Sequence, residues 1–156
     1  MKLRHFLSGV FLFAASGAFA GTCDKNIIEV RDNGVQAQFE IELAMTAAEQ
    51  SQGLMFRESM PQFSGMLFIY DRPRRVSFWM KNTLIPLDML FIDETGVVQR
   101  IKNSATPLDE TPVPGGDGIQ YVLEINGGVS QILGFSDGAE IRYIRIPQEN
   151  AVWPCE

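Results

Sequence analysis

The chain has 156 residues, and its 13 lysines and arginines stand against 19 aspartates and glutamates. This excess of acidic residues disfavours nucleic acid and anionic membrane surfaces as partners. The single histidine is His5, close to the N-terminus. If the first residues are removed, mechanisms that need a histidine base or a histidine-bound metal are excluded, and we expect no metal and no cofactor.

The first 20 residues are typical of a secretory signal peptide. Lys2 and Arg4 precede an uncharged run that ends in the small-x-small triplet Ala18-Phe19-Ala20. The run is too short for a transmembrane helix, which takes roughly 20 residues, so we expect no membrane anchor. We predict cleavage after Ala20, a periplasmic or secreted location, and one β-rich domain over residues 21–156. Loss of Lys2 and Arg4 would leave 11 basic residues against 19 acidic ones, a net charge of −8.

The two cysteines, Cys23 and Cys155, stand near the two ends of the mature chain. In an oxidising compartment we expect them to form one disulfide. The alternative is a pair of free, reactive thiols.

Hydrophobic patterning and turn residues predict a mainly β protein. Alternating or continuous apolar runs predict strands over residues 36–43, 65–71, 76–81, 88–93, 97–102, 120–125 and 140–146. Thr46 and Glu49 form a capping box that predicts a short helix ending at Gly53, and a second short helix is expected over 127–135. The fold class is therefore mainly β (α+β), a compact single-domain β-barrel-like structure or highly twisted sheet with two short helices.

Two connections are also predicted. The basic run 71–75 (DRPRR) should form a turn between strands, and the proline- and glycine-rich segment 104–118 should form an irregular surface loop, a candidate lid over a site. Gly96 should take a positive φ angle in the hairpin that joins the strands 88–93 and 97–102.

Four polar residues interrupt the most apolar stretch, residues 78–93 (FWMKNTLIPLDMLFID). On a strand, Trp79, Lys81 and Thr83 would share one face, and an aromatic ring beside hydroxyl and ammonium donors is typical of a small-ligand pocket. Buried Asp88 strengthens this interpretation, because a buried carboxylate is costly unless it is paired. The predicted ligand-binding residues are Arg57, Trp79, Lys81, Asn82, Thr83 and Asp88.

A structural interpretation of the same residues stays open. Trp79 would then pack under a loop, Lys81 would pair with Asp88 or Glu124, and Thr83 would cap the turn before Pro86. A catalytic interpretation is also open: Asp88 and Glu124 lie in apolar surroundings that could separate their pKa values, as in a carboxylate-dependent hydrolase. A Ser77–Lys81 dyad is rejected, since four residues along a strand place them about 13 Å apart.

The motifs GLMFRE (53–58), GMLFIYD (65–71), MKNTLIPLD (80–88) and YVLEI (121–125) together resemble a bacterial and archaeal family, the domain of unknown function 192 family. The resemblance covers about residues 36–146. It implies a small single-domain β-rich protein, often exported, and brings no catalytic residue with it. It also implies that Pro86 belongs to the family pattern, together with Arg57, Lys81, Asn82, Thr83 and Asp88.

These observations lead to one functional expectation and two alternatives. We expect an exported, non-enzymatic binding module with a pocket for a small anionic or sugar-like ligand. The first alternative is a structural or protein-interaction role in the cell envelope, with an envelope protein as partner. The second is the carboxylate-dependent hydrolase that uses Asp88 and Glu124.

Overall fold

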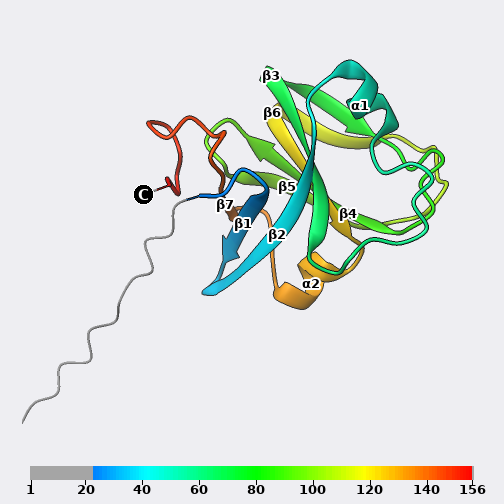
Figure 1. Ribbon diagram of the computed structural model, residues 1–156, viewed down its shortest axis with the longest axis horizontal. Helices are drawn as coiled ribbons and strands as arrows, with labels where there is room; N and C mark the ends of the chain where they lie inside the picture. The colour runs from blue at the N-terminus through cyan, green and yellow to red at the C-terminus, as the bar shows by residue number, and fades with distance from the viewer. Residues whose placement is uncertain (1–22, 156) are drawn as a thin grey trace, which may run out of the picture.

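One curled sheet forms the body of the molecule (Figure 1). The structure, a computed structural model, describes residues 23–155. Its strands are β1 (Ile27–Asp32), β2 (Val35–Ala44), β3 (Ser64–Phe78), β4 (Leu87–Asp93), β5 (Val98–Ala105), β6 (Val113–Asn126) and β7 (Glu140–Arg142). They follow the order β5-β4-β6-β3-β2-β1-β7. Strands β2 and β3 are parallel, and all other neighbours are antiparallel.

The sheet curls into a half-barrel whose edge strands approach each other at one end. There Val97 forms an isolated bridge with Glu140. The Val98 amide donates to the Ala139 carbonyl and the Ile141 amide donates to the Gly96 carbonyl, both at 2.8 Å. Gly96 has the predicted positive φ, 91°. These bonds satisfy part of both sheet edges, which would otherwise present unpaired backbone groups.

The two short helices are those that the sequence predicts, and Figure 1 shows α1 at the top and α2 at the bottom of the molecule. Helix α1 (Ala47–Gln52) begins with the Thr46–Glu49 capping box. After it, Gly53 has a φ of 48°, and a Cβ there would lie 3.2 Å from the Phe68 ring, so glycine permits both the backbone angle and the close approach. Helix α2 (Val129–Leu133) ends at left-handed Gly134.

Both faces of the central strands are buried, as the doubly apolar run 65–71 predicts. In β3, Leu67 belongs to a core inside the curl of the sheet, where it packs with residues such as Phe39, Leu123 and Ile141. Its neighbour Phe68 belongs to a second core on the other face, with Met89 and Phe91 among its members. Alternation along the strands separates the two cores.

Four sequence predictions of local structure are corrected. The strand predicted over residues 76–81 ends at Phe78, so Trp79, Lys81 and Thr83 lie in a connection and do not share a strand face. The run 71–75 is no turn, because β3 continues through it with shifts of register between Ile69 and Arg74. Pairing with β6 on both sides of this bulge outweighs the local turn preference, and Pro73 falls where the ladder is interrupted. The loop predicted over 104–118 is confined to residues 106–112, and β7 ends at Arg142 instead of reaching residue 146.

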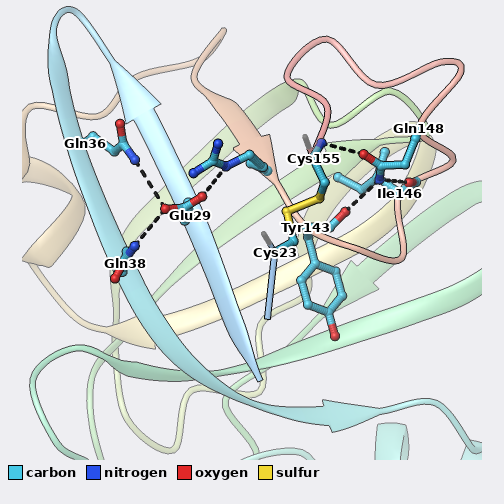
Figure 2. The surroundings of a disulfide bond; sticks show 9 residues. Cys23, Glu29, Gln36, Gln38, Tyr143, Ile146, Gln148 and Cys155 are labelled. Atoms are coloured by element: carbon cyan, nitrogen blue, oxygen red, sulfur yellow. Dashed lines mark hydrogen bonds and ion pairs between the residues drawn. A yellow bond between two sulfur atoms is a disulfide. The ribbon is translucent and has the colours of Figure 1, made fainter. Parts of the chain in front are cut away.

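A disulfide joins the two ends of the described chain (Figure 2). Cys23 and Cys155 are bonded, with their Cα atoms 5.7 Å apart. Figure 2 also shows Glu29, whose carboxylate accepts hydrogen bonds from Gln36 and Gln38. Arg142 forms an ion pair with the same carboxylate. The C-terminal segment is therefore fastened to the sheet, as the cysteine positions predict.

The sequence also predicts a signal peptide and no membrane anchor. The signal peptide over residues 1–20 lies outside the described residues. Within residues 23–155, no helix is long and apolar enough to cross a membrane.

Candidate functional site

A cavity of about 110 Å³ lies on the face of the sheet that carries α1. The end of α1 and the turn after it form one side, β3 and the start of the β3–β4 connection form the other, and one side chain comes from β6. Its lining includes four aromatic rings, three aliphatic hydroxyl groups and one carboxyl: Phe68, Tyr70, Phe78, Trp79, Ser51, Ser77, Thr83 and Glu124. A lining that combines aromatic rings with convergent polar groups is typical of a small-ligand site.

Glu124 is the central feature of this cavity. In β6 it lies opposite Met66 of β3 and Met89 of β4, so apolar side chains flank it on both sides. Only 4% of its surface is exposed, and among residues 23–155 no hydrogen bond or ion pair reaches its carboxyl oxygens. Burial raises its pKa from 4.5 to about 8, so the carboxyl is mostly protonated at pH 7. It can therefore both donate and accept a hydrogen bond.

The aromatic walls are held in place by their own packing. The rings of Phe68 and Phe78 meet edge to face with centroids 5.0 Å apart, and Phe78 meets Phe91 at 5.9 Å. Trp79 is 48% exposed, which places it at the mouth of the cavity. The Lys81 ammonium lies over its ring, 5.2 Å from the centroid. Of the predicted ligand-binding residues, Trp79 and Thr83 line the cavity, and Lys81 lies against a ring that does.

Tyr70 lines the cavity and contacts Arg74, a cation of the same strand, β3. The Arg74 guanidinium lies over its ring, 5.3 Å from the centroid. Burial raises the pKa of the Tyr70 phenol, while the positive charge of Arg74 acts in the opposite direction. The phenol thus stays protonated at neutral pH and is a further hydrogen-bond donor in the cavity.

Asn82 and Thr83 join the loops beside the cavity. Asn82 has a φ of 53°, and its carbonyl accepts a hydrogen bond of 2.8 Å from the Phe56 amide. Thr83 is buried, its hydroxyl donates to the Lys81 carbonyl at 3.2 Å, and its own carbonyl accepts from the Leu108 amide. Asn82 therefore supports the site through its backbone and through its side-chain amide, which donates to the Met55 sulfur at 3.9 Å, while Thr83 lines the cavity.

Asp88 has a structural environment. Its carboxylate accepts hydrogen bonds from three backbone amides, those of Ser104 (2.7 Å), Gly128 (2.8 Å) and Ser130 (2.8 Å). These bonds satisfy a fully buried charge and connect β4 to β5 and to the start of α2. Within residues 23–155, Lys81 forms no ion pair with Asp88 or with Glu124. The pairing expected for Lys81 is therefore wrong.

Arg57 also lies outside the cavity lining. Its guanidinium forms a two-pronged ion pair with Glu42 of β2, with N–O distances of 2.5 Å and 2.7 Å. The hydrogen bonds from Arg57 lower the pKa of Glu42. This pair fastens the segment after α1 to the sheet.

The carboxylate pair needed for hydrolysis is not assembled. In the β4–β6 ladder Asp88 lies opposite Ile125, and Glu124 lies opposite Met89. Because residues directly opposite each other share a face, Asp88 and Glu124 point to opposite sides of the sheet. They share no cleft. Residues 23–155 also bring together no group of three or more potential metal-ligating side chains.

Sequence reasoning missed most of the cavity walls. It selected Glu124 as a catalytic candidate and overlooked Tyr70, Phe68 and Phe78. A glutamate inside the apolar run YVLEI, and a tyrosine at the end of the buried run GMLFIY, were the available signals. Neither pattern shows that the side chains of Glu124 and Tyr70 line the same cavity.

Comparisons with known proteins agree with this fold. The family model DUF192, described as "Uncharacterized ACR", matches residues 28–143. A protein of unknown function from Novosphingobium aromaticivorans DSM 12444 has 41% identity and a TM-score of 0.72 over 74% of this chain and 82% of its own. A protein from Sinorhizobium meliloti 1021, for which a role as a transcription regulator has been suggested, has 36% identity and a TM-score of 0.73 over 78% of this chain and 95% of its own. The search of curated proteins found no match.

Proposed function

Since the chain belongs to the DUF192 family, whose members are uncharacterised, we propose its function from the cavity: it is a small non-enzymatic binding module for a sugar-like or small anionic ligand. The observation that carries this proposal is the carboxyl of Glu124, which lines the cavity, is 4% exposed and has no hydrogen bond or ion pair to another of residues 23–155. Its oxygens are open to the cavity and are not sealed inside the protein. A ligand that bonds to them would supply the partner that the described residues do not.

The lining supports a hydroxylated ligand. Glu124, Tyr70, Ser77 and Thr83 each offer a group that can donate or accept a hydrogen bond, and the Trp79 ring at the mouth offers an apolar platform. At about 110 Å³ the cavity is smaller than an engineered cavity of about 150 Å³ that holds benzene. It therefore suits one edge of a sugar ring, with the remainder of the ligand outside.

The disulfide supports the expected location of this module. A bonded cysteine pair is typical of extracellular and periplasmic proteins. We propose on this ground, and on the character of residues 1–20, that the protein is exported by a signal peptide cleaved after Ala20 and acts in the periplasm or outside the cell. A role in transcription regulation is not carried over, because the formal net charge of −6 disfavours contact with nucleic acid.

Thermal unfolding of the mature, oxidised protein with a panel of sugars, sugar acids and dicarboxylates tests the proposal. A ligand at one hundred times its Kd should add about 2.7 kcal/mol, a rise of roughly 6 to 10 °C in Tm. Glu124→Leu should abolish the shift, and Glu149→Leu, at an exposed C-terminal position, should keep it. If no compound of the panel raises Tm, or if the shift survives Glu124→Leu, the cavity is not the binding site.

A second candidate, interaction with an envelope protein, is favoured by the apolar surface beside the cavity. Phe56, Leu84 and Leu108 are 66%, 44% and 59% exposed, on loops joined by the Asn82 and Thr83 backbone bonds. Site-specific photo-crosslinking at Leu108 should then give a discrete adduct that is missing when the crosslinker is placed at Glu149. The same products at both positions would contradict this candidate.

A further inference from the structure

A second cavity adjoins the cavity of Glu124. It has a volume of about 480 Å³ and shares Gln50 and Tyr70 with the first. The Gln50 amide donates to the Ile69 carbonyl at 2.9 Å and also bonds to the Ala44 carbonyl, so the shared residue is fixed against β2 and β3. The two cavities are therefore neighbours that share two lining residues, one of which is held in place by hydrogen bonds to β2 and β3.

The second cavity differs from the first in its charge. Arg72 and Arg74 line it, together with one carboxylate, Asp71. The ion pairs of residues 23–155 involve other arginines, namely Arg31, Arg57, Arg75 and Arg142. Arg74 instead lies over the Tyr70 ring. Two guanidinium groups thus gather at one opening of a protein that is acidic overall.

The backbone holds these arginines in position. They belong to the bulged part of β3, and β3 pairs with β6 on both sides of the bulge, at Ile69–Tyr121 and Arg74–Ile119. A bulge leaves its residues unpaired and redirects their side chains, while the paired residues on both sides keep the strand in the sheet. An exposed turn, the simpler interpretation of a basic run, would lack this constraint.

We propose that the two cavities form one composite site for a hydroxylated carboxylate of the hexuronic acid class, whose hydroxyl groups reach Glu124 and whose carboxylate meets Arg72 and Arg74. This inference rests on the proposed function and selects one ligand class for it. Guanidinium groups suit carboxylates because they offer parallel N–H donors. Asp71 reduces the formal charge of the second cavity to +1, which matches a monoanion better than a doubly charged phosphate.

Isothermal titration of the mature protein with a matched pair of ligands tests this inference. Glucuronic acid and glucose differ in having a carboxylate or a CH₂OH group at one ring carbon, so their ratio of Kd values reports the carboxylate contact alone. We expect glucuronate to bind about tenfold more tightly at low salt, a typical effect for one charge-assisted contact that stays partly exposed.

Variants then assign the contact. Arg74→Gln should remove the preference for glucuronate, measured as the ratio of the Kd values of glucose and glucuronate, while Asp71→Asn should strengthen glucuronate binding. Arg75→Gln is the matched control, because Arg75 belongs to the same run but is paired with Asp117, at 2.6 Å. It should leave both Kd values unchanged.

The possible results separate the inference from the function on which it rests. Equal Kd values for the two ligands, or a preference that survives Arg74→Gln, would overturn the composite site and leave the cavity of Glu124 as a sugar site. Tight binding of a simple phosphate in place of glucuronate would overturn the ligand class. If neither sugar binds but another compound raises Tm and Glu124→Leu abolishes that rise, the composite site is wrong and the proposed binding function stands. If no compound binds, the composite site and the proposed function are both wrong.

Discussion

Replacement of Glu124 by glutamine should stabilise the protein, increasingly so as pH rises. The reason is the difference between the pKa of about 8 in the folded chain and the ordinary 4.5 in the unfolded chain. Between these two values the unfolded chain has lost the proton and the folded chain keeps it, so ionisation favours unfolding. The contribution of Glu124 to stability is thus fully present below pH 4.5 and is lost as pH rises to 8.

The size of the effect follows from the same two values. Each pH unit between 4.5 and 8 should lower the free energy of unfolding of the wild-type protein by about 1.4 kcal/mol relative to Glu124→Gln. The difference between the two proteins should reach about 3 kcal/mol at pH 7 and about 5 kcal/mol above pH 8. A glutamine side chain has nearly the same size and does not titrate, so the slope of this difference belongs to the carboxyl group.

Urea unfolding of both proteins at half-unit intervals from pH 4 to 9 measures this slope. A constant offset between them would report only the cost of burying an amide in place of a carboxyl, whereas a rising difference reports the titration. Other groups titrate alike in both proteins and cancel when they are distant. Glu149→Gln, at an exposed position, is the control for replacing a glutamate by glutamine.

A flat difference for Glu124→Gln would refute the reasoning. It would mean that the carboxyl titrates normally, through solvent access or a partner that satisfies its charge. The argument for a ligand would then lose its main support, because an ordinary surface glutamate needs no ligand to remove a cost of burial.

Three further predictions concern stability. Asp88→Ala should destabilise the protein by about 3 kcal/mol in urea unfolding, because three backbone amides, one buried and two partly buried, lose their acceptor; a loss below about 1 kcal/mol would show that these amides find other partners. Gly115→Ala should cost about 1 to 3 kcal/mol in the same assay, since a Cβ would lie 2.3 Å from the Phe91 ring, and an unchanged midpoint would contradict the close packing. Replacing both Cys23 and Cys155 by serine should lower stability by at most about 4 to 5 kcal/mol, the chain-entropy value for the long loop that the disulfide closes; a larger loss would require a further role for the C-terminal segment.

The sequence by itself determined the parts of this protein that depend on neighbouring residues. Alternation in residues 36–43 predicted β2, the Thr46–Glu49 capping box predicted α1, and Gly134 marked the end of α2. The two-sided apolar run 65–71 predicted that β3 is central. These patterns act over one turn of helix or a few residues of strand, so a single sequence contains them in full.

Only the tertiary structure decided which polar residues meet. The pairing of β4 with β6 placed Asp88 and Glu124 on opposite faces, although both had been equal candidates for one site. The bulge in β3 kept Arg72 and Arg74 on a strand beside Tyr70, where local preference predicted a turn. Strand register and bulges depend on partners roughly 35 to 50 residues away in the chain, so the pattern around any one residue does not contain them.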